Sequence, residues 1–539
     1  MSTETDKTMV GVLAAVVVIF LINPFSLTLA QDTTVTSQIA SIPRTSSDEV
    51  MKRPVALTDG AGHMHQKVST NSDQAQAYYD QGIAYLHSYV WVEAARSFHE
   101  ALLLDPQLAM AHLGLAKAYT GATAYKDAFS HLKRASEIAA QGNLTEKEAQ
   151  WIALGQQQLD GIFASPQERS KRLQEYRQAI DELIVLDPDD PHAWVLRGNA
   201  SERSVSGRGQ GGRVASVAYY DAALKRDPEH FGAHHYLVHS YESLGRYDKA
   251  GEHGKRYAAA VSGVPHAQHM YAHVLPRLGK WTEALDQLEK ADLLQREYFA
   301  AGVAPIEEWH HGHNIHVMGA VHLRMGNYEE VGKLFEEAFH LEVRSLRDGR
   351  FTDPWLGYLL MRGRFEEALS AALEAEKRPL AVARLTGAAR ATEALLALGR
   401  IGEAREAQER LHTYFEEFKR DTANPIYERL QNRYQERTVD VVEAQLALVS
   451  DHPEEAEAKL IQLADGFAVS KTLDGWVTGL FRLEELAGAA LRAGRPQLAE
   501  ALIERMHRID PDYTPSIEKA LEEETRKQSS EVRRLTTQD

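Results

Sequence analysis

The stretch YYDQGIAYLHSYVWVEAARSFHEALLLDP, residues 78–106, determines the fold class of this chain. Its apolar residues recur at three- and four-residue spacing, which is the period of one face of an α-helix. We interpret the stretch as two helices packed against each other. Gly82 is small enough to let them approach closely, and Ala94 and Phe98 fill the space between successive helix pairs. Pro106 cannot continue a helix, so the second helix is predicted to end there.

The helix pair repeats along the chain. From Asp73 onward, segments with the helical period alternate with short turns, and no sustained strand-like alternation occurs. Several turns carry a glycine followed two residues later by an aromatic or apolar residue, as at Gly245, Gly279, Gly326, Gly363 and Gly399. Further Asp-Pro helix stops stand at residues 187–188, 227–228 and 510–511. The chain is therefore predicted to be all-α.

Residues of the opening stretch match the spacing of the tetratricopeptide pattern at Tyr78, Gly82, Tyr85, Ala94, Phe98, Ala101 and Pro106. The stretch departs from that pattern at Tyr78, where tryptophan is usual, and at Gln81, where leucine is usual. The chain resembles a tetratricopeptide repeat (TPR) protein over almost all of its ordered length. The resemblance implies a right-handed superhelical solenoid whose first helices line a concave groove, and such grooves usually bind peptides. More narrowly, residues 62–70, 233–245 and 265–281 resemble an exported bacterial subgroup of these proteins.

The pattern divides the chain into five expected regions. They are residues 1–30 as a signal peptide or N-terminal anchor, 31–72 as a linker or extended lead-in, 73–345 as the superhelix with a histidine-lined groove, 346–520 as C-terminal TPR-like repeats, and 521–539 as a frayed tail. The lead-in is rich in Ser, Thr and Gln and has little apolar periodicity, so order is expected to begin near Asp73.

The composition excludes several classes of function. A formal net charge of -17 argues against binding nucleic acid, because the phosphate backbone would be repelled over most of the surface. The chain has no cysteine, which excludes disulfides, thiolate metal sites and thiol catalysis. Any metal ion must therefore be bound by histidine, aspartate or glutamate.

The N-terminus carries an apolar run from Met9 to Ile22, followed by small residues that offer a cleavage point before Gln31. A cleaved secretory signal and an uncleaved anchor are both compatible with it. The run is shorter than the roughly 20 residues that a spanning helix needs, and Pro24 interrupts its continuation. Either interpretation places the body of the protein in the periplasm or outside the cell, with membrane contact only through an uncleaved N-terminal segment.

Histidines recur at equivalent positions when the repeats are aligned on their turn glycines. Of the nine slots ten, six and thirteen residues before Gly245, Gly279 and Gly326, all but those at Gly232 and Ala320 hold a histidine. These histidines are His235, His239, His266, His269, His273, His313 and His316. Spacings of three, four and seven residues lie on one helical face. In the TPR pattern these slots face the groove, so three neighbouring helices are predicted to present one patch of imidazoles.

Imidazole is the commonest metal ligand among side chains, and two histidines four residues apart on a helix can bind one ion. Copper or zinc fits such a patch better than magnesium or calcium, which prefer oxygen ligands. We hypothesise an exported solenoid that binds one or two ions, in metal binding or metal-dependent chemistry. Glu242, one turn after His239, is a candidate to orient an imidazole or to act as a general base.

A metal-free interpretation remains open beside this one. The solenoid would then be a scaffold that binds a protein or peptide partner in its concave groove, or that associates with copies of itself. The sequence leaves open whether the protein is an enzyme. His87, His112 and His322 stand where these repeats pack apolar or aromatic side chains, so we expect a packing role for them.

Overall fold

The computed structural model describes residues 42–517, except residues 43, 206, 208, 210–213, 343–352, 423–431, 451–452 and 468–472. The described residues form helices and turns, and no strand occurs among them. Within this part of the chain no helix is both long and apolar enough to cross a membrane. The predicted N-terminal signal or anchor, the predicted tail and the predicted boundary between residues 345 and 346 all lie outside the described residues.

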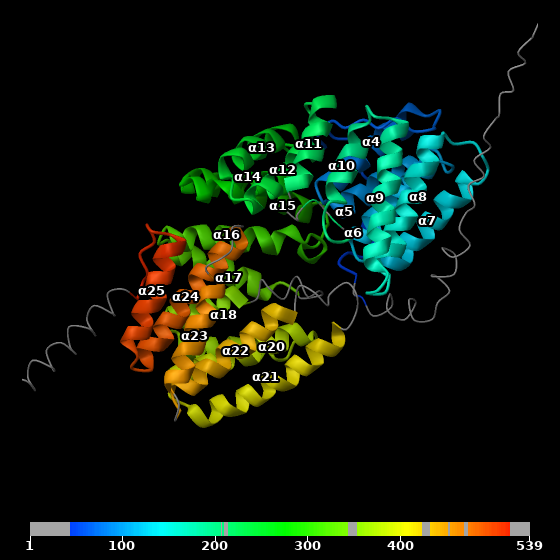
Figure 1. Ribbon diagram of the computed structural model, residues 1–539. Coiled ribbons are helices and arrows are strands. Elements are labelled where there is room, and N and C mark those ends of the chain that lie inside the picture. Colours follow the sequence, from blue (N-terminus) through cyan, green and yellow to red (C-terminus); the bar gives the residue numbers. More distant parts are fainter. Residues whose placement is uncertain are drawn as a thin grey trace, which may run out of the picture.

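The helices follow one another with short connections (Figure 1). The first group comprises α3 (Asp48–Met51), η1 (Asp59–Ala61), α4 (Asp73–His87), α5 (Trp91–Leu104), α6 (Ala109–Gly121), α7 (Tyr125–Ala139), α8 (Glu146–Ile162), α9 (Arg169–Leu186), α10 (Pro191–Asn199), α11 (Val214–Arg226), α12 (Phe231–Ser243), α13 (Tyr247–Ala260), α14 (Pro265–Val274), η2 (Leu275–Leu278) and α15 (Trp281–Ala300). The second group comprises η3 (Pro305–Glu307), α16 (His310–Arg324), α17 (Tyr328–His340), α18 (Asp353–Met361), α19 (Phe365–Ala375), α20 (Ala381–Ala397), α21 (Ile401–Asp421), α22 (Asn432–Leu448), α23 (Pro453–Phe467), α24 (Leu473–Arg492) and α25 (Pro496–Ile509).

Consecutive helices from α4 onward pack as pairs, which confirms the predicted helix-pair repeat. The predicted turn glycines have φ values between 71° and 78°, in the left-handed region where a side chain is strained. In each of these turns the second helix begins two residues after the glycine. The equivalent positions of the first two pairs hold Tyr89 (φ 58°) and Thr123 (φ 56°) instead.

Close approach of the first helices depends on small residues beside Phe98. A Cβ atom added at Gly82 would lie 2.5 Å from Phe98 Cε1, and one added at Gly114 would lie 2.4 Å from Phe98 Cζ. Phe98 is fully buried between α4 and α6 as a result. The predicted roles of Gly82 and Phe98 are confirmed, and this spacing sets how closely successive pairs stack.

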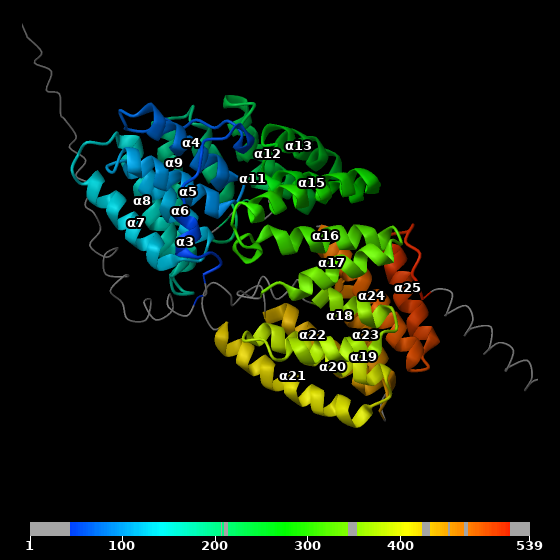
Figure 2. The same ribbon diagram turned by 180° about the vertical axis from the view of Figure 1, so that it is seen from behind.

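The pairs wind into a superhelix, and the winding brings distant helices together (Figures 1 and 2). α4 packs against α12, and α24 packs against α18. Figure 1 shows α24 and α25 beside α16 and α17, while α4 to α15 form the other body of the molecule. The inner surface of the solenoid is therefore covered in places by its own earlier and later repeats.

The apolar core has two large parts that meet at α14, and α16 belongs to the second part. One part is built from residues between Ile42 and Val303, and the other from residues between Ala272 and Tyr513. The helices at the junction are those that carry the predicted histidine patch. Imidazoles therefore occupy a seam where neighbouring repeats elsewhere are joined by apolar side chains.

The lead-in packs on the superhelix, which corrects the expectation that order begins near Asp73. Met51 is 0% exposed, and Val50 and Val68 are also buried in the first core. The backbone N–H of Thr58 donates to Gln81 Oε1 at 2.8 Å, and Gln81 Nε2 donates to a lead-in carbonyl. This contact explains why a polar residue stands at position 81 instead of the leucine that the repeat pattern favours.

We predict that Gly399→Ala lowers the free energy of unfolding by about 1–2 kcal/mol, because alanine is strained at φ 72°. A Cβ atom there would meet nothing within 4 Å, so the cost comes from the backbone alone. Gly402→Ala is the matched control, since Gly402 lies in α21 and its added Cβ also meets nothing within 4 Å. It is expected to stabilise by about 0.5–1 kcal/mol. Urea unfolding followed by circular dichroism measures both changes, and equal effects would contradict the assignment.

We predict that Met51→Ala destabilises the protein by about 2–5 kcal/mol, because it leaves a cavity in the first core. Leu57→Ala, in the same lead-in, is the matched control, since Leu57 is 45% exposed. The control is expected to change stability by no more than about 0.5 kcal/mol. Thermal and urea unfolding compare the two variants. A Met51 variant as stable as the Leu57 variant would show that the lead-in does not support the core.

Candidate metal centre

Three neighbouring helices carry the predicted histidines. α12, α14 and α16 are the first helices of consecutive pairs, and each packs against the next. The side chain of His230 caps α12 by accepting a hydrogen bond from the N–H of Ala233, and Pro265 starts α14. Because the three helices occupy equivalent places in the repeat, their histidines meet along one face.

Six of the predicted ligands gather in two groups of three. The groups are the His266 triad, formed by His235, His239 and His266, and the His273 triad, formed by His269, His273 and His313. In each triad one nitrogen from every ring lies within 4.8 Å of the other two. The triads adjoin each other, since the ring centroids of His266 and His269 are 6.1 Å apart. The predicted patch is thus a pair of compact imidazole clusters.

His316, the seventh predicted ligand, lies outside both triads. It follows His313 by three residues, which turns its side chain by about 300° around the helix axis. Its ring centroid lies 6.1 Å from that of Phe335, and it lines a cavity of about 230 Å³ near α18, α20 and α24. Burial lowers the pKa of His316 to about 4. The structure therefore places His316 beside the centre and not in it.

Two histidines of each triad are buried and the third is half-buried, so the predicted groove-facing patch is largely covered. His235 is 0% exposed and His269 is 1% exposed. The ring of Tyr89, just after α4, has its centroid 4.7 Å from that of His235. Asp474, at the start of α24, contacts the His273 triad. The superhelix winds far enough for its own first and last repeats to cover the histidines.

The nitrogens of the His266 triad converge on one point. His235 Nδ1 donates to the carbonyl oxygen of His87 at 2.6 Å, which leaves the lone pair of its Nε2 directed at the other two rings. His235 Nε2 lies 3.2 Å from His239 Nε2 and 3.0 Å from His266 Nε2. A metal-binding histidine commonly donates its second ring N–H to a backbone carbonyl in this way, because the bond fixes the ring and its tautomer.

The His266 triad is electrically neutral at pH 7. Burial lowers the pKa of His235 to about 3 and holds those of His239 and His266 well below the ordinary value. For His239 and His266 the neighbouring imidazoles act in the same direction, because like charges repel. Neutral imidazole is the form that binds metal ions.

A buried acid adjoins this triad. The ring of His310 has its centroid 4.2 Å from that of His266, and His310 Nδ1 lies 2.5 Å from Glu308 Oε1. Burial raises the pKa of Glu308 to about 7. The segment before α16, which lengthens the interval between the turn glycines Gly279 and Gly326, thus places an acid and an imidazole against the centre.

The rings of the His273 triad are fixed from outside. His269 Nδ1 donates to the side-chain oxygen of Asn314 at 3.0 Å, and His273 Nδ1 donates to Glu242 Oε1 at 3.0 Å. The Nε2 atoms of His269 and His273 are buried without a hydrogen-bond partner. Buried polar atoms in proteins are nearly always paired, so two such atoms in one cluster call for an explanation.

Two carboxylates border the His273 triad. Asp474 Oδ1 lies 2.8 Å from His313 Nε2 and 3.4 Å from His273 Nε2. Burial alone would lower the pKa of His273, but Glu242 and Asp474 outweigh it and raise that pKa to about 10. Burial would likewise raise the pKa of Asp474, but His313 and His273 hold it well below the ordinary value. Negative charge is thus concentrated beside this triad.

Glu242 orients an imidazole, but not the one nearest in sequence. Its Oε1 atom accepts from His273 on the next helix and from the N–H of Leu473 at 2.8 Å. Glu242 is 2% exposed. It therefore links α12, α14 and the start of α24 at the centre.

Tyr89 holds a strained backbone conformation beside the centre. It stands at the turn position that glycine occupies in the later pairs, with φ 58°. Its ring centroid lies 5.3 Å from that of His266, and its carbonyl oxygen accepts a hydrogen bond from Trp309 Nε1. A non-glycine residue persists in this region only where its surroundings hold it, and such residues concentrate at functional sites.

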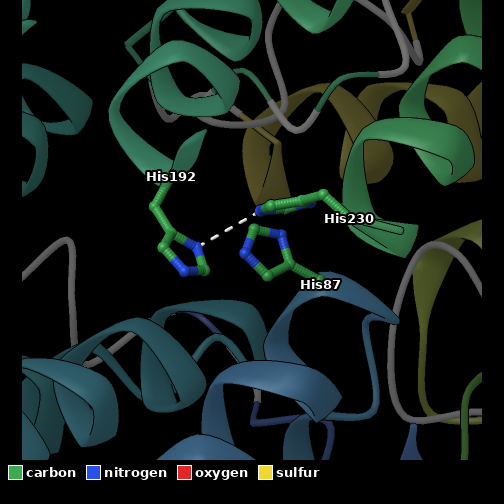
Figure 3. Close-up of side chains that lie close together, drawn as sticks. All are labelled: His87, His192 and His230. Atoms are coloured by element: carbon green, nitrogen blue, oxygen red, sulfur yellow. Dashed lines mark hydrogen bonds between the residues drawn. The ribbon is translucent and has the colours of Figure 1, made fainter. Parts of the chain in front are cut away.

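A third group, the His87 triad, was not predicted. It consists of His87 at the end of α4, His192 in α10 and His230 before α12 (Figure 3). His230 Nδ1 accepts from Ala233 N–H, so its Nε2 carries the proton and donates to His192 Nδ1 at 3.3 Å. His192 Nε2 in turn donates to the carbonyl oxygen of His65 at 3.2 Å. These bonds already satisfy His192 and His230, unlike the open Nε2 atoms of the His273 triad.

Sequence reasoning missed several residues at the centre. Asp474 lies in the divergent C-terminal repeats, and no local pattern marks it. His87 was expected to pack, and its ring does pack between histidines and Tyr236, but its carbonyl also fixes His235. Tyr89 carried a recognisable signal, because it interrupts the series of turn glycines.

The comparison with protein families identifies the repeat in one part of the chain. The sequence profile of the tetratricopeptide repeat family matches residues 208–265, which include α11, α12 and α13. No curated protein matches the chain. Among solved structures, yeast Tom70 is 12% identical, with 82% of this chain and 91% of that chain covered and a TM-score of 0.38. A tetratricopeptide repeat protein from Parabacteroides merdae is 14% identical, with 53% and 99% covered and a TM-score of 0.34.

The type IV pilus biogenesis factor PilW is 18% identical, with 41% of this chain and 94% of that chain covered and a TM-score of 0.24. Likenesses at this level say nothing about function. The family match coincides with helix pairs whose turn geometry recurs from Gly245 to Gly399. The family match therefore shows a tetratricopeptide repeat within residues 208–265, and the same helix-pair geometry recurs along the described part of the chain.

Proposed function

We propose that this protein binds one or two metal ions, copper(II) or zinc, through the histidines buried inside its superhelix. The observation that carries the proposal is the pair of buried Nε2 atoms of His269 and His273, which have no hydrogen-bond partner. His269 donates from Nδ1 to Asn314, so the Nε2 lone pair of its neutral ring is available. Glu242 and Asp474 keep His273 protonated when no metal ion is bound, and an ion bound at its Nε2 would replace that proton. An ion bound to both atoms and to His313 would satisfy them.

Charge favours a divalent cation at the His273 triad. Glu242 and Asp474 bring two negative charges, which balance one divalent ion bound by neutral imidazoles. Asp474 also stands close enough to serve as a fourth ligand, since its Oδ1 atom approaches both His313 and His273. Three histidines and one carboxylate complete the tetrahedral set that zinc prefers.

The His266 triad would hold a second ion. Ligands at about 2.0–2.1 Å from a tetrahedral ion lie about 3.3–3.4 Å from one another. The nitrogens of His235 lie 3.2 Å from His239 and 3.0 Å from His266, close to that spacing. The proposal covers metal binding and metal-dependent chemistry at the two triads.

A metal-free scaffold is the second candidate, because the tetratricopeptide fold is of the kind that binds other proteins. A peptide partner in the groove would have to reach the histidines to explain their alignment. His235, His266 and His269 are at most 2% exposed, so a docked peptide would not contact them. Burial therefore favours metal over peptide as the ligand of the triads. Export to the periplasm or the cell exterior, suggested by residues 1–30, is part of the proposal.

We predict that His269→Ala combined with His273→Ala weakens metal binding at the His273 triad by at least about 100-fold. Alanine is a good helix former, so helical content should be unchanged. Titration calorimetry with zinc and copper, and elemental analysis of untagged protein, measure the loss of one equivalent. His340→Ala combined with His412→Ala, outside the triads, is the matched control. Wild-type stoichiometry and affinity in the triad variant would contradict the proposal.

We predict that Glu242→Gln weakens zinc binding by about 10- to 100-fold, because the amide keeps the shape of the side chain but removes the charge behind His273. Glu484→Gln is the matched control. Glu484 is 1% exposed and accepts hydrogen bonds from Ser516, so it resembles Glu242 in burial while lying away from the triads. The control should lose stability without losing metal affinity. Equal zinc affinities in the two variants would show that Glu242 does not support metal binding.

A further inference from the structure

A separate cavity of about 160 Å³ lies among α4, α6, α8 and α10. His87 and His192 form part of its wall, but the members of the His266 and His273 triads do not line it. Most of the remaining wall is aromatic or aliphatic and includes Trp91, Tyr125 and Ile162. Its volume is similar to that of a cavity of about 150 Å³ that holds benzene. The space is thus suited to a molecule with one small ring.

Lys117 supplies a positive charge to this cavity. Its ammonium lies 4.8 Å from the ring centroid of Trp151, which also lines the cavity. In the described part of the chain no carboxylate lies within ion-pair distance of Lys117, and no other lysine, arginine or carboxylate lines the cavity. Burial lowers the pKa of Lys117 to about 8, which still leaves most of the lysine charged at pH 7. Lys117 is half-buried, and Asp190 acts on it only from beyond ion-pair distance. A desolvated cation with no adjacent counter-ion is costly.

A second hydrogen-bond donor in the wall of this cavity also lacks a partner. Trp151 Nε1 is buried and has no hydrogen-bond partner. The other polar groups of the wall are already engaged: Gln158 donates to the carbonyl oxygen of Val205, and Asn199 accepts from Tyr220. Burial lowers the pKa values of all three histidines of the His87 triad, so these imidazoles are neutral and supply no negative charge. The unmet demand in this cavity is therefore for an acceptor with negative charge.

We propose that the cavity binds a small carboxylate with an apolar, ring-sized body. The carboxylate pairs with the ammonium of Lys117, and the body packs against the aromatic and aliphatic wall. A carboxylate matches a single lysine better than phosphate does, because phosphate carries more charge and more acceptor atoms than one cation and an apolar wall can satisfy. This site is independent of the proposed metal ions.

Binding of benzoate and cyclohexanecarboxylate to the full chain, after removal of metal with a chelator, tests the proposal by titration calorimetry. Chelation separates this site from carboxylate binding to a metal ion. Benzamide and benzyl alcohol are the uncharged controls. Acetate is the carboxylate control without an apolar ring, and inorganic phosphate is the control for a different anion. Benzoate or cyclohexanecarboxylate should bind at least about 10-fold more tightly than each control. Equal binding of benzamide and benzoate, or binding of none of the carboxylates, would overturn the proposal.

Lys117→Met should weaken benzoate binding by at least about 10-fold while keeping the fold, because methionine fills similar space without charge. Lys133→Met is the matched control, since the Lys133 side chain is 63% exposed, and it should bind like the wild type. Leu196→Trp fills the cavity and leaves Lys117 in place, so it should also abolish binding. Circular dichroism and melting temperature establish that each variant is folded. Wild-type benzoate affinity in a folded Lys117→Met or Leu196→Trp variant would show that the ligand lies elsewhere.

Discussion

The hydrogen bond from His235 to the carbonyl oxygen of His87 joins residues 148 positions apart. The candidate metal centre depends on this contact between the end of α4 and α12. Helix pairs in a solenoid normally contact only their neighbours. Here the winding is tight enough for α4 to reach α12, and the resulting contact fixes the His235 ring and covers the triads with Tyr89. Tight winding in turn depends on the close stacking that Gly82 and Gly114 allow around Phe98. Close packing in the first repeats therefore helps to position the histidines of later repeats.

The repeat itself could be predicted from the sequence because its determinants are local. The turn glycines, the Asp-Pro stops and Gly82 act within one helix pair, so their spacing is visible along the chain. The meeting of the α12 histidines with those of α14, as in His235 and His266, could be predicted for the same reason, since the first helices of stacked repeats lie side by side. His316 shows the limit of this reasoning, because its slot was equivalent but its ring faces α17 through Phe335.

Contacts across the superhelix could not be predicted in this way. The contact between Glu242 and Leu473 spans 231 residues, and it depends on the accumulated rotation of all the repeats between them. Small differences in each repeat add up, so a pattern read one repeat at a time does not fix where α24 arrives. The lead-in is a related case. Its few apolar residues, such as Met51, form no periodic pattern, yet each is buried against helices that the rest of the chain provides.

The division of the apolar core at α14 bears on the cooperativity of unfolding. Apolar contacts couple the unfolding of neighbouring repeats, and here they are extensive within each part of the core. At the seam, apolar side chains of α14 and α15 are accompanied by directional hydrogen bonds from imidazoles to Asn314 and Glu242. Cooperative unfolding of the two parts consequently depends on polar contacts here as well as on apolar ones.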